Sequence, residues 1–174
     1  EILATLAMAQ CTLEIALTPR DDSSPHPHGL EDIEFLISTN PGAAPQPLGK
    51  IASGGELSRI SLAIQVVTAS GGTVPSMVFD EVDVGIGGAV AEVVGGLLRD
   101  LAKEAQVLCV THLPQVAAQG HQHLQVSKSA DKKTVQTAMS RLDANGRVGE
   151  IARMLGGVKI TEQTLAHARE MLES

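Results

Sequence analysis

Aromatic side chains are nearly absent from this chain. Its 174 residues include two phenylalanines, Phe35 and Phe79, and neither tyrosine nor tryptophan. Recognition of single-stranded nucleic acid by base stacking needs aromatic side chains, so the composition argues against that mode of binding. With 43% hydrophobic residues, the core must be built from Leu, Ile, Val, Met and Ala. The length predicts one domain that is large enough for a substantial core.

Positive charge is also scarce. The chain has 13 Lys and Arg against 20 Asp and Glu, which gives a net charge of −7 and argues against a broad basic DNA-binding surface. Lys128, Lys132 and Lys133 could form a local basic patch, but a solvated hairpin explains them more simply.

Cysteines and long hydrophobic runs are few as well. Cys11 and Cys109 are isolated thiols in apolar runs, which is typical of buried thiols in a reducing compartment. No stretch reaches transmembrane length, and no basic and apolar leader follows Glu1. We therefore expect a cytoplasmic protein without a membrane partner. Because no initiating Met is present, we also expect a segment of a longer protein.

The apolar pattern predicts strands that alternate with helices. A short helix within 1–9 precedes strands at 12–18 and 32–39, which we expect to pair as a hairpin before a Pro/Gly loop at 40–50. The remaining predicted elements are a helix from 53 to about 70, a strand at 77–79, a helix from 87 to 101, a strand at 106–111, a hairpin of 124–127 with 134–140, and helices near 148–155 and 161–172. This order predicts an α/β fold with a mostly parallel sheet flanked by helices and an N-terminal β-hairpin.

Residues 53–56 combine signals for the start of a helix with two glycines, whose backbone no side chain covers. In Ser53-Gly54-Gly55-Glu56, the serine and the acid three residues later have capping-box spacing, and Gly71-Gly72 ends the predicted helix. Leu57, Ile60, Ile64 and Val67 are predicted to share the apolar face of this helix. The glycines expose N–H groups that a phosphate can approach at the positive end of the helix dipole. An ordinary capped helix explains these residues equally well.

Acids and a histidine follow the two predicted parallel strands. Asp80 and Glu81 end the first strand and His112 ends the second, so all three should emerge at one sheet edge, where ligands of open α/β sheets bind. Asp80 can hold Mg²⁺, Glu81 can accept a proton from an attacking water, and His112 can bond a γ-phosphate or that water. The alternatives are solvated acids at a strand end and a surface histidine beside the helix that starts near Pro114.

The ordered set predicts phosphoryl chemistry, but one part is missing. A phosphate cradle, a metal ligand with a base, and a γ-phosphate sensor follow one another along the chain. A P-loop needs G-x-x-x-x-G-K-[ST]. The only Gly-Lys pair, Gly49-Lys50, has Ala44 in place of the first glycine and Ile51 in place of Ser/Thr. The chain therefore carries half of a nucleotide site.

These motifs resemble the ATP-binding-cassette ATPase heads of the SMC-like class. Ser53-Gly54-Gly55-Glu56 resembles the signature motif, Val78 to Glu81 a Walker B strand, Val82-Asp83 the D-loop, and Thr111-His112 the switch histidine. The runs SGGELSRISLAIQV, FDEVDVGIGG, CVTHLPQVAAQGHQH and ARMLGG are similar to those of bacterial DNA double-strand-break repair members. The resemblance covers most of residues 33–157. It implies that residues 1–174 form a C-terminal head lobe, with the Walker A lobe and the coiled coil outside this chain.

The resemblance also implies roles for these residues. Two heads would sandwich two ATP molecules as a homodimer. Ser53, Gly54, Gly55 and Glu56 would contact in trans the γ-phosphate held by the opposite head. Asp80 would orient Mg²⁺, Glu81 would be the general base, His112 would position water and phosphate, and Asp83 would couple the two sites. DNA would be bound through the full-length protein, and its location would be cytoplasmic, with nucleoid association on DNA damage.

Three explanations remain open at this point. The parent protein is either a DNA-repair ATPase or a transporter ATPase subunit. Alternatively, this chain is a non-catalytic module that binds another chain through its signature face. Glu56, where transporters usually have Gln, disfavours the transporter. Without Walker A, the isolated lobe is expected to be inactive.

Arg59 is expected to link the signature helix to neighbouring elements. His26, His28, His121 and His123 have poor metal spacing, and the last two are expected in the second hairpin.

Overall fold

A computed structural model of the chain describes residues 2–20, 27, 29–50, 54–69, 75–80, 82–131, 134–157 and 159–173. The chain forms two compact units, residues 1–65 and 66–174. None of the helices in the described ranges combines the length and the hydrophobicity that a bilayer crossing requires. Ser53, Glu81, His26, His28, Gly71, Gly72, Lys132 and Lys133 lie outside the described residues.

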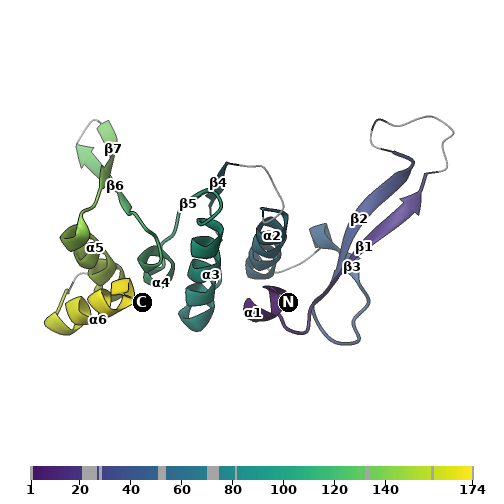
Figure 1. The fold of residues 1–174 in the computed structure, drawn as a ribbon, viewed down its shortest axis with the longest axis horizontal. Coiled ribbons are helices and arrows are strands. Elements are labelled where there is room, and N and C mark those ends of the chain that lie inside the picture. Colours follow the sequence, from purple (N-terminus) through teal and green to yellow (C-terminus); the bar gives the residue numbers. More distant parts are fainter. Residues whose placement is uncertain are drawn as a thin grey trace. The chain divides into compact units, whose positions relative to one another are not determined.

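The first unit is built on an antiparallel hairpin. After the short helix α1 (Ile2–Thr5), β1 (Thr12–Pro19) pairs with β2 (Glu31–Ser38), as predicted, and the two strands run side by side in Figure 1. The register places Leu13 opposite Ile37 and Ile15 opposite Phe35. Alternation therefore gives the hairpin one apolar face. Ile37 is buried at one end of that face, whereas Ile15 is 60% exposed.

The loop expected at 40–50 contains structure that the sequence pattern did not indicate. β3 (Gln46–Pro47) pairs antiparallel with β2, and η1 (Leu48–Lys50) forms a single 3₁₀ turn. A two-residue strand is too short to show periodicity, and its partner supplies the hydrogen bonds. Gly49 and Lys50 lie in η1, so the Gly-Lys pair has no P-loop conformation.

Helix α2 (Gly54–Ala69) begins at the first signature glycine, in the first unit. Its predicted apolar face was only partly right. Ile60 is fully buried, but Leu57 is 40% and Val67 61% exposed. The buried positions continue instead through Leu62, Ala63 and Val66. Because α2 carries apolar side chains around most of its circumference, spacing alone could not select the buried side.

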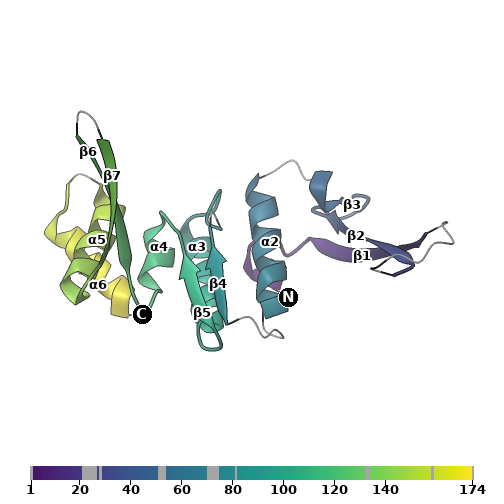
Figure 2. The same ribbon diagram turned by 90° about the horizontal axis from the view of Figure 1, so that it is seen from above.

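The second unit contains the predicted parallel pair. β4 (Ser76–Phe79) and β5 (Gln106–Cys109) align Val78 with Leu108, and α3 (Gly88–Leu101) lies along the pair (Figure 2). Among the described strands this is the parallel pairing, and the other pairs are antiparallel. Phe79 is buried, but Val78 is 70% exposed on the opposite face. The continuous apolar runs predicted strands buried on both faces, and here one face is open.

Helices and a second hairpin complete this unit. They are α4 (Pro114–Ala118), β6 (Leu124–Asp131), β7 (Thr134–Arg141), α5 (Ala144–Gly156) and α6 (Glu162–Glu173). β6 and β7 form the predicted antiparallel hairpin. His121 and His123, expected in this hairpin, lie instead in the connection that leads into β6. A core of Ala118, Ile151, Ala152 and Ala168 joins α4, α5 and α6.

A buried carboxylate ties α5 to β6. Glu150 accepts two hydrogen bonds from the Arg153 guanidinium, at 2.8 and 2.6 Å, and one from Gln125 Nε2 at 2.6 Å. The bonds from Arg153 are the largest influence on the pKa of Glu150 and lower it, although burial acts in the opposite direction. The native state therefore favours the ionised carboxylate.

We predict that Glu150→Gln lowers the free energy of unfolding at pH 7 by roughly 1–2 kcal/mol, because the charged partner of Arg153 and Gln125 is lost. The loss stays this small because Arg153 is half-exposed and water weakens its pair with Glu150. Since the folded pKa lies below the ordinary value of 4.5, the ionised group stabilises the fold above that pH. The contribution is lost as the pH falls through the folded pKa. Urea unfolding of both proteins from pH 7 to pH 3 measures this, and their difference should shrink below about pH 4.5.

The matched control is Glu104→Gln, at an exposed position between α3 and β5. It should leave the free energy of unfolding within about 0.5 kcal/mol of wild type. Equal losses in both variants, or a difference for Glu150→Gln that does not change with pH, would contradict the prediction.

Candidate functional site

The carboxyl ends of β4 and β5 meet at one edge of the parallel pair. Phe79 is aligned with Cys109, and the Val110 N–H donates to the Phe79 carbonyl at 2.8 Å, so the ladder continues one residue beyond β5. Asp80 leaves β4 at this edge with an exposed side chain. The segment that leads to His112 leaves β5 at the same edge. The sequence prediction that Asp80 and His112 share an edge is confirmed, and Glu81 lies outside the described residues.

The turn after β4 buries a second carboxylate. Asp83 is 2% exposed. Its Oδ2 accepts hydrogen bonds from Thr111 Oγ1 at 2.5 Å and from the backbone N–H of His112 at 3.0 Å. Thr111 Oγ1 in turn accepts from the Leu113 N–H at 3.0 Å. These bonds satisfy a carboxylate that would otherwise be costly to bury, and they connect the turn after β4 to the segment after β5.

The same carboxylate orients the His112 ring. Asp83 Oδ2 lies 3.2 Å from His112 Nδ1, and the side chain of His112 is 72% exposed. Of the two neutral tautomers, a carboxylate at Nδ1 favours the one that carries its proton on that nitrogen, which leaves Nε2 as the acceptor. The arrangement fixes one side of the ring and leaves the other accessible to a ligand or a water molecule.

Thr111 is the contributor that sequence reasoning missed. It entered only as the neighbour of the histidine, yet its hydroxyl joins Asp83 to the main chain at Leu113. A hydroxyl residue between an apolar strand and a histidine is a weak signal. Its partner lies 28 positions away in the sequence, so the pairing requires the fold.

Cys109 lies near this edge without the properties of a nucleophile. Burial is the main cause that raises its pKa to about 11, and the carboxylates of Asp83 and Asp80 raise it further. The thiol therefore stays protonated near neutral pH, and the thiolate needed for attack or metal binding is not formed. The described residues contain no group of three or more His, Cys, Asp or Glu side chains that could hold a metal ion.

The glycine turn belongs to the other compact unit. Gly54 is the first residue of α2 and is exposed, and Gly55 and Glu56 are half-buried in the first turn. A Cβ added at Gly54 would meet nothing within 4 Å, so the space on that side of its Cα is open. Ser53, the predicted cap, lies outside the described residues. Burial, the largest influence, raises the pKa of the Cys11 thiol, and the charge of Glu56 raises it further, while Arg59, one turn further along α2, acts in the opposite direction.

Comparison with known proteins identifies close relatives. The chain is 55% identical over 172 residues to the DNA repair protein RecN of Xylella fastidiosa (strain Temecula1), an alignment that covers 99% of this chain and 31% of the relative. It is 52% identical over 168 residues to RecN of Vibrio cholerae, covering 97% of this chain and 30% of the relative. The chain thus spans about a third of the length of the curated relatives it matches. No protein-family model matches the chain.

Solved structures share the fold. The Smc head domain of Pyrococcus yayanosii aligns with a TM-score of 0.64 at 18% identity, over 86% of this chain and 27% of that one. A structure described for ATP-driven dimerization and DNA-stimulated activation of SMC ATPases aligns with a TM-score of 0.59 at 18% identity, over 91% and 89% of the two chains. The predicted α/β fold and the predicted resemblance to SMC-like heads and to a repair protein are confirmed.

We predict that Asp83→Ala lowers the free energy of unfolding by about 1–3 kcal/mol, because it leaves the Thr111 hydroxyl and the His112 N–H without their acceptor. Asp83→Asn should cost less, since an amide oxygen still accepts. Urea unfolding of this chain measures both. Asp80→Asn, at the exposed acid of the same edge, is the control and should stay within about 0.5 kcal/mol of wild type. A loss for Asp83→Ala no larger than that of the control would contradict the assigned bonds.

Proposed function

We propose, from its homology to part of the RecN proteins, that this chain is the C-terminal lobe of an SMC-like ATPase head that takes part in DNA repair. In the whole protein, two heads would sandwich and hydrolyse ATP and so gate the binding or tethering of DNA. The observation that carries this proposal is the edge of the β4–β5 pair, where Asp80 is exposed and buried Asp83 holds the accessible His112.

Each group at the edge has a role in this proposal. Asp80 would hold Mg²⁺ through its exposed carboxylate. A single carboxylate fits Mg²⁺, which proteins often hold with one or two carboxylates, several waters and the substrate phosphates. Bound Mg²⁺ would neutralise charge on the phosphates. Glu81, the next residue, is the general base for the attacking water. His112 positions that water and the γ-phosphate, and Asp83 keeps its ring oriented.

The signature residues act on a second head. Gly54 and Gly55 offer backbone N–H groups in the first turn of α2, beside Ser53 and Glu56. Because a helix N-terminus attracts anions, these groups suit a γ-phosphate. Gly49 and Lys50 lie in a 3₁₀ turn and provide no P-loop, so the phosphate would be held by the Walker A motif of the opposite head. Asp83, in the D-loop, would couple the two sites of the homodimer.

Two apolar faces favour a further partner within the same polypeptide. One lies on the β1–β2 hairpin, where Ile15 and Ile33 are 60% and 64% exposed. The other lies on the β4–β5 pair, where Val78 and Val110 are 70% and 60% exposed. Parallel strands are normally covered on both faces. Since more than two thirds of the length of the relatives lies outside this chain, we assign the cover to the N-terminal Walker A lobe of the same protein.

The proposed setting follows from the relatives. Because the relatives are named for DNA repair, the whole protein would act on DNA, and the net charge of −7 disfavours a broad basic DNA-binding surface on this lobe. The location would be cytoplasmic, with association to the nucleoid after DNA damage. Without Walker A, the isolated lobe should neither grip nor hydrolyse ATP. On its own, the lobe could only act as a head-interaction module, because ATP binding needs the N-terminal lobe of the same protein.

We predict that Glu81→Gln in the full-length protein slows ATP turnover by about 10²–10⁴-fold, because the amide cannot accept a proton from the attacking water. Steady-state phosphate release measures this. Glu92→Gln, an exposed acid on α3, is the matched control and should turn over at the wild-type rate. A Glu81→Gln protein that hydrolyses ATP within about twofold of wild type would remove the base assignment.

We predict that Ser53→Arg in the full-length protein blocks ATP-dependent association of heads, because its bulk and charge occupy the surface that faces the opposite γ-phosphate. ATP binding by single protomers should remain, since the Walker A motif lies in the other lobe. Sedimentation with ATP in the Glu81→Gln background measures association, and titration of a fluorescent ATP analogue measures binding. Ser53→Ala is the steric control and should still associate. Loss of protomer binding in Ser53→Arg would show that the serine contacts nucleotide in cis.

A further inference from the structure

An arginine on α5 binds the segment at the C-terminal end of α4, whereas His112 lies just before the N-terminal end of this helix. The Arg147 guanidinium donates to three main-chain carbonyls: Ala118 at 3.4 Å, Gly120 at 2.5 Å and His121 at 3.3 Å. Ala118 ends α4, and the other two carbonyls lie just beyond it in the sequence. A planar guanidinium can serve several carbonyls at once because its donors form a rigid fork.

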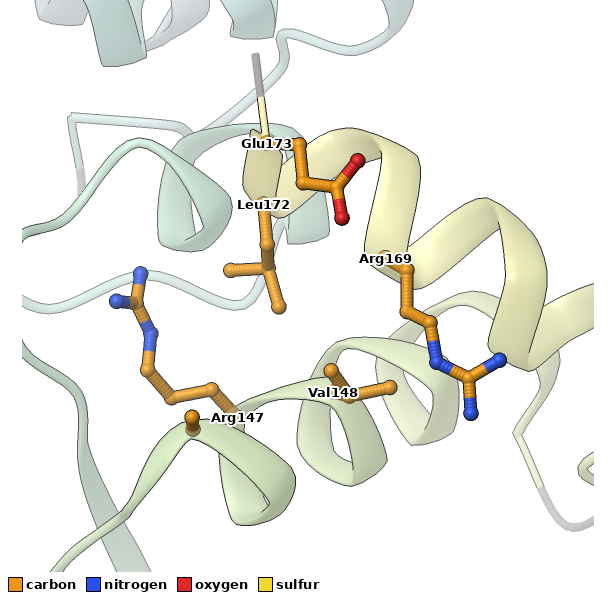
Figure 3. Close-up of a pocket in the computed structure, with 6 residues that line it drawn as sticks. Arg147, Val148, Arg169, Leu172 and Glu173 are labelled. Carbon is orange, nitrogen blue, oxygen red and sulfur yellow. The ribbon is translucent and has the colours of Figure 1, made fainter.

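The position of Arg147 in α5 is unfavourable for helix stability. It is the fourth residue of the helix, where the dipole repels a positive charge. Its Nε is buried and has no hydrogen-bond partner among the described residues. Arg147 therefore adds little to α5 itself, and its benefit must come from the segment that it binds. Figure 3 shows its side chain and that of Arg169, on α6, extending in different directions around Val148 and Leu172.

The position of helix α4 depends on contacts with neighbouring elements. It has five residues, far fewer than an isolated helix needs for stability, so its placement depends on its neighbours. At its start, Asp83 fixes Thr111 and the His112 N–H. At its end, Arg147 binds the carbonyls, and Arg99 of α3 donates to Gln119 Oε1 at 3.3 Å. A buried carboxylate and a guanidinium thus anchor opposite ends of one short segment.

A close approach to α3 keeps α4 from shifting freely. A Cβ at Gly95 would lie 2.8 Å from Gln119 Cγ and 3.1 Å from the Gln115 carbonyl, so a larger residue there would have to displace Gln119 and crowd the backbone of α4. Pro114, Val116 and Ala118 are buried. Because α4 is packed along its length, a displacement of its end would be passed to its start, where His112 lies.

We infer that Arg147 is a positioning residue for His112 and acts through α4. This inference rests on the proposed function, in which His112 positions the attacking water and the γ-phosphate. A positioning residue contacts neither ATP nor water, so its loss should slow the chemical step while ATP binding is retained. Misplacement of a reacting group by about 1 Å can cost roughly 100-fold in rate.

The experiment is a double-mutant cycle on ATP turnover by the full-length protein. The variants are Arg147→Met, His112→Ala and the two combined, and Arg169→Met is the matched control on α6. Met keeps the stem of the arginine and removes its donors. We expect Arg147→Met to lower kcat by roughly 10- to 100-fold with little change in affinity for a fluorescent ATP analogue. The combined variant should be about as slow as His112→Ala alone, and Arg169→Met should behave as wild type.

The outcomes separate the inference from the proposed function. If wild-type protein does not hydrolyse ATP, or if His112→Ala leaves kcat unchanged, the proposed function fails and the inference fails with it. A different outcome overturns the inference alone. In that case His112→Ala slows turnover, and Arg147→Met lowers kcat by the same factor in the His112→Ala protein as in the wild-type protein, so Arg147 acts independently of the histidine.

A second variant keeps the test decisive if Arg147→Met does not fold. Arg147→Lys keeps the charge, but an ammonium cannot match the planar fork, so it enters the same cycle and should be slower than wild type. Amide hydrogen exchange of Ala117 to His121 should become faster in Arg147→Lys, because the segment loses part of its anchor. Unchanged exchange there, or a wild-type kcat, would overturn the inference.

Discussion

The candidate site depends on the buried carboxylate of Asp83. Each strand of the parallel pair has only four residues, so the ladder itself gives little control over the segments beyond the two strands. Asp83 Oδ2 supplies that control by accepting from Thr111 and His112 at once. The cost of burying the charge is offset only while these donors are in place. The bonds therefore make the turn after β4 and the segment after β5 one structural element, and the exposed histidine ring is part of it.

The rest of the second unit supports the same segment from the other side. α5 contributes Arg147 to the carbonyls beyond α4, and Glu150 one turn later holds Gln125 at the start of β6. Between Asp83 and α5, charged side chains bind neighbouring segments: Asp83 accepts from the segment after β5, Arg147 donates to main-chain carbonyls, and Glu150 accepts from Gln125 and Arg153. Such contacts are directional, so they fix orientation, which the small aliphatic core of α4, α5 and α6 could not fix alone.

Much of this architecture could be predicted from local pattern. The β1–β2 hairpin follows from alternation, and α3 and α5 follow from helical spacing, because these patterns depend on neighbours within a few residues. Asp80 and His112 could be assigned to one edge because parallel strands point the same way. The two-residue β3 could not be predicted, nor could the buried side of α2, whose apolar residues surround the helix. The open face of Val78 was also missed, since an apolar run specifies a preference for burial and not the element that covers it.

Local side-chain order is thus enough for most of the elements, their sequence along the chain, and the candidate groups Asp80 and His112, whereas Asp83 entered only through the family resemblance. It is silent on partners far apart in sequence. Thr111 meets Asp83 across 28 positions, and Arg147 meets Ala118 across 29. No periodicity reports such pairs, because they form only when sheet and helices bring the segments within hydrogen-bond distance. Folding alone decided that His112 is held from both ends of its segment, by a carboxylate at one and a guanidinium at the other.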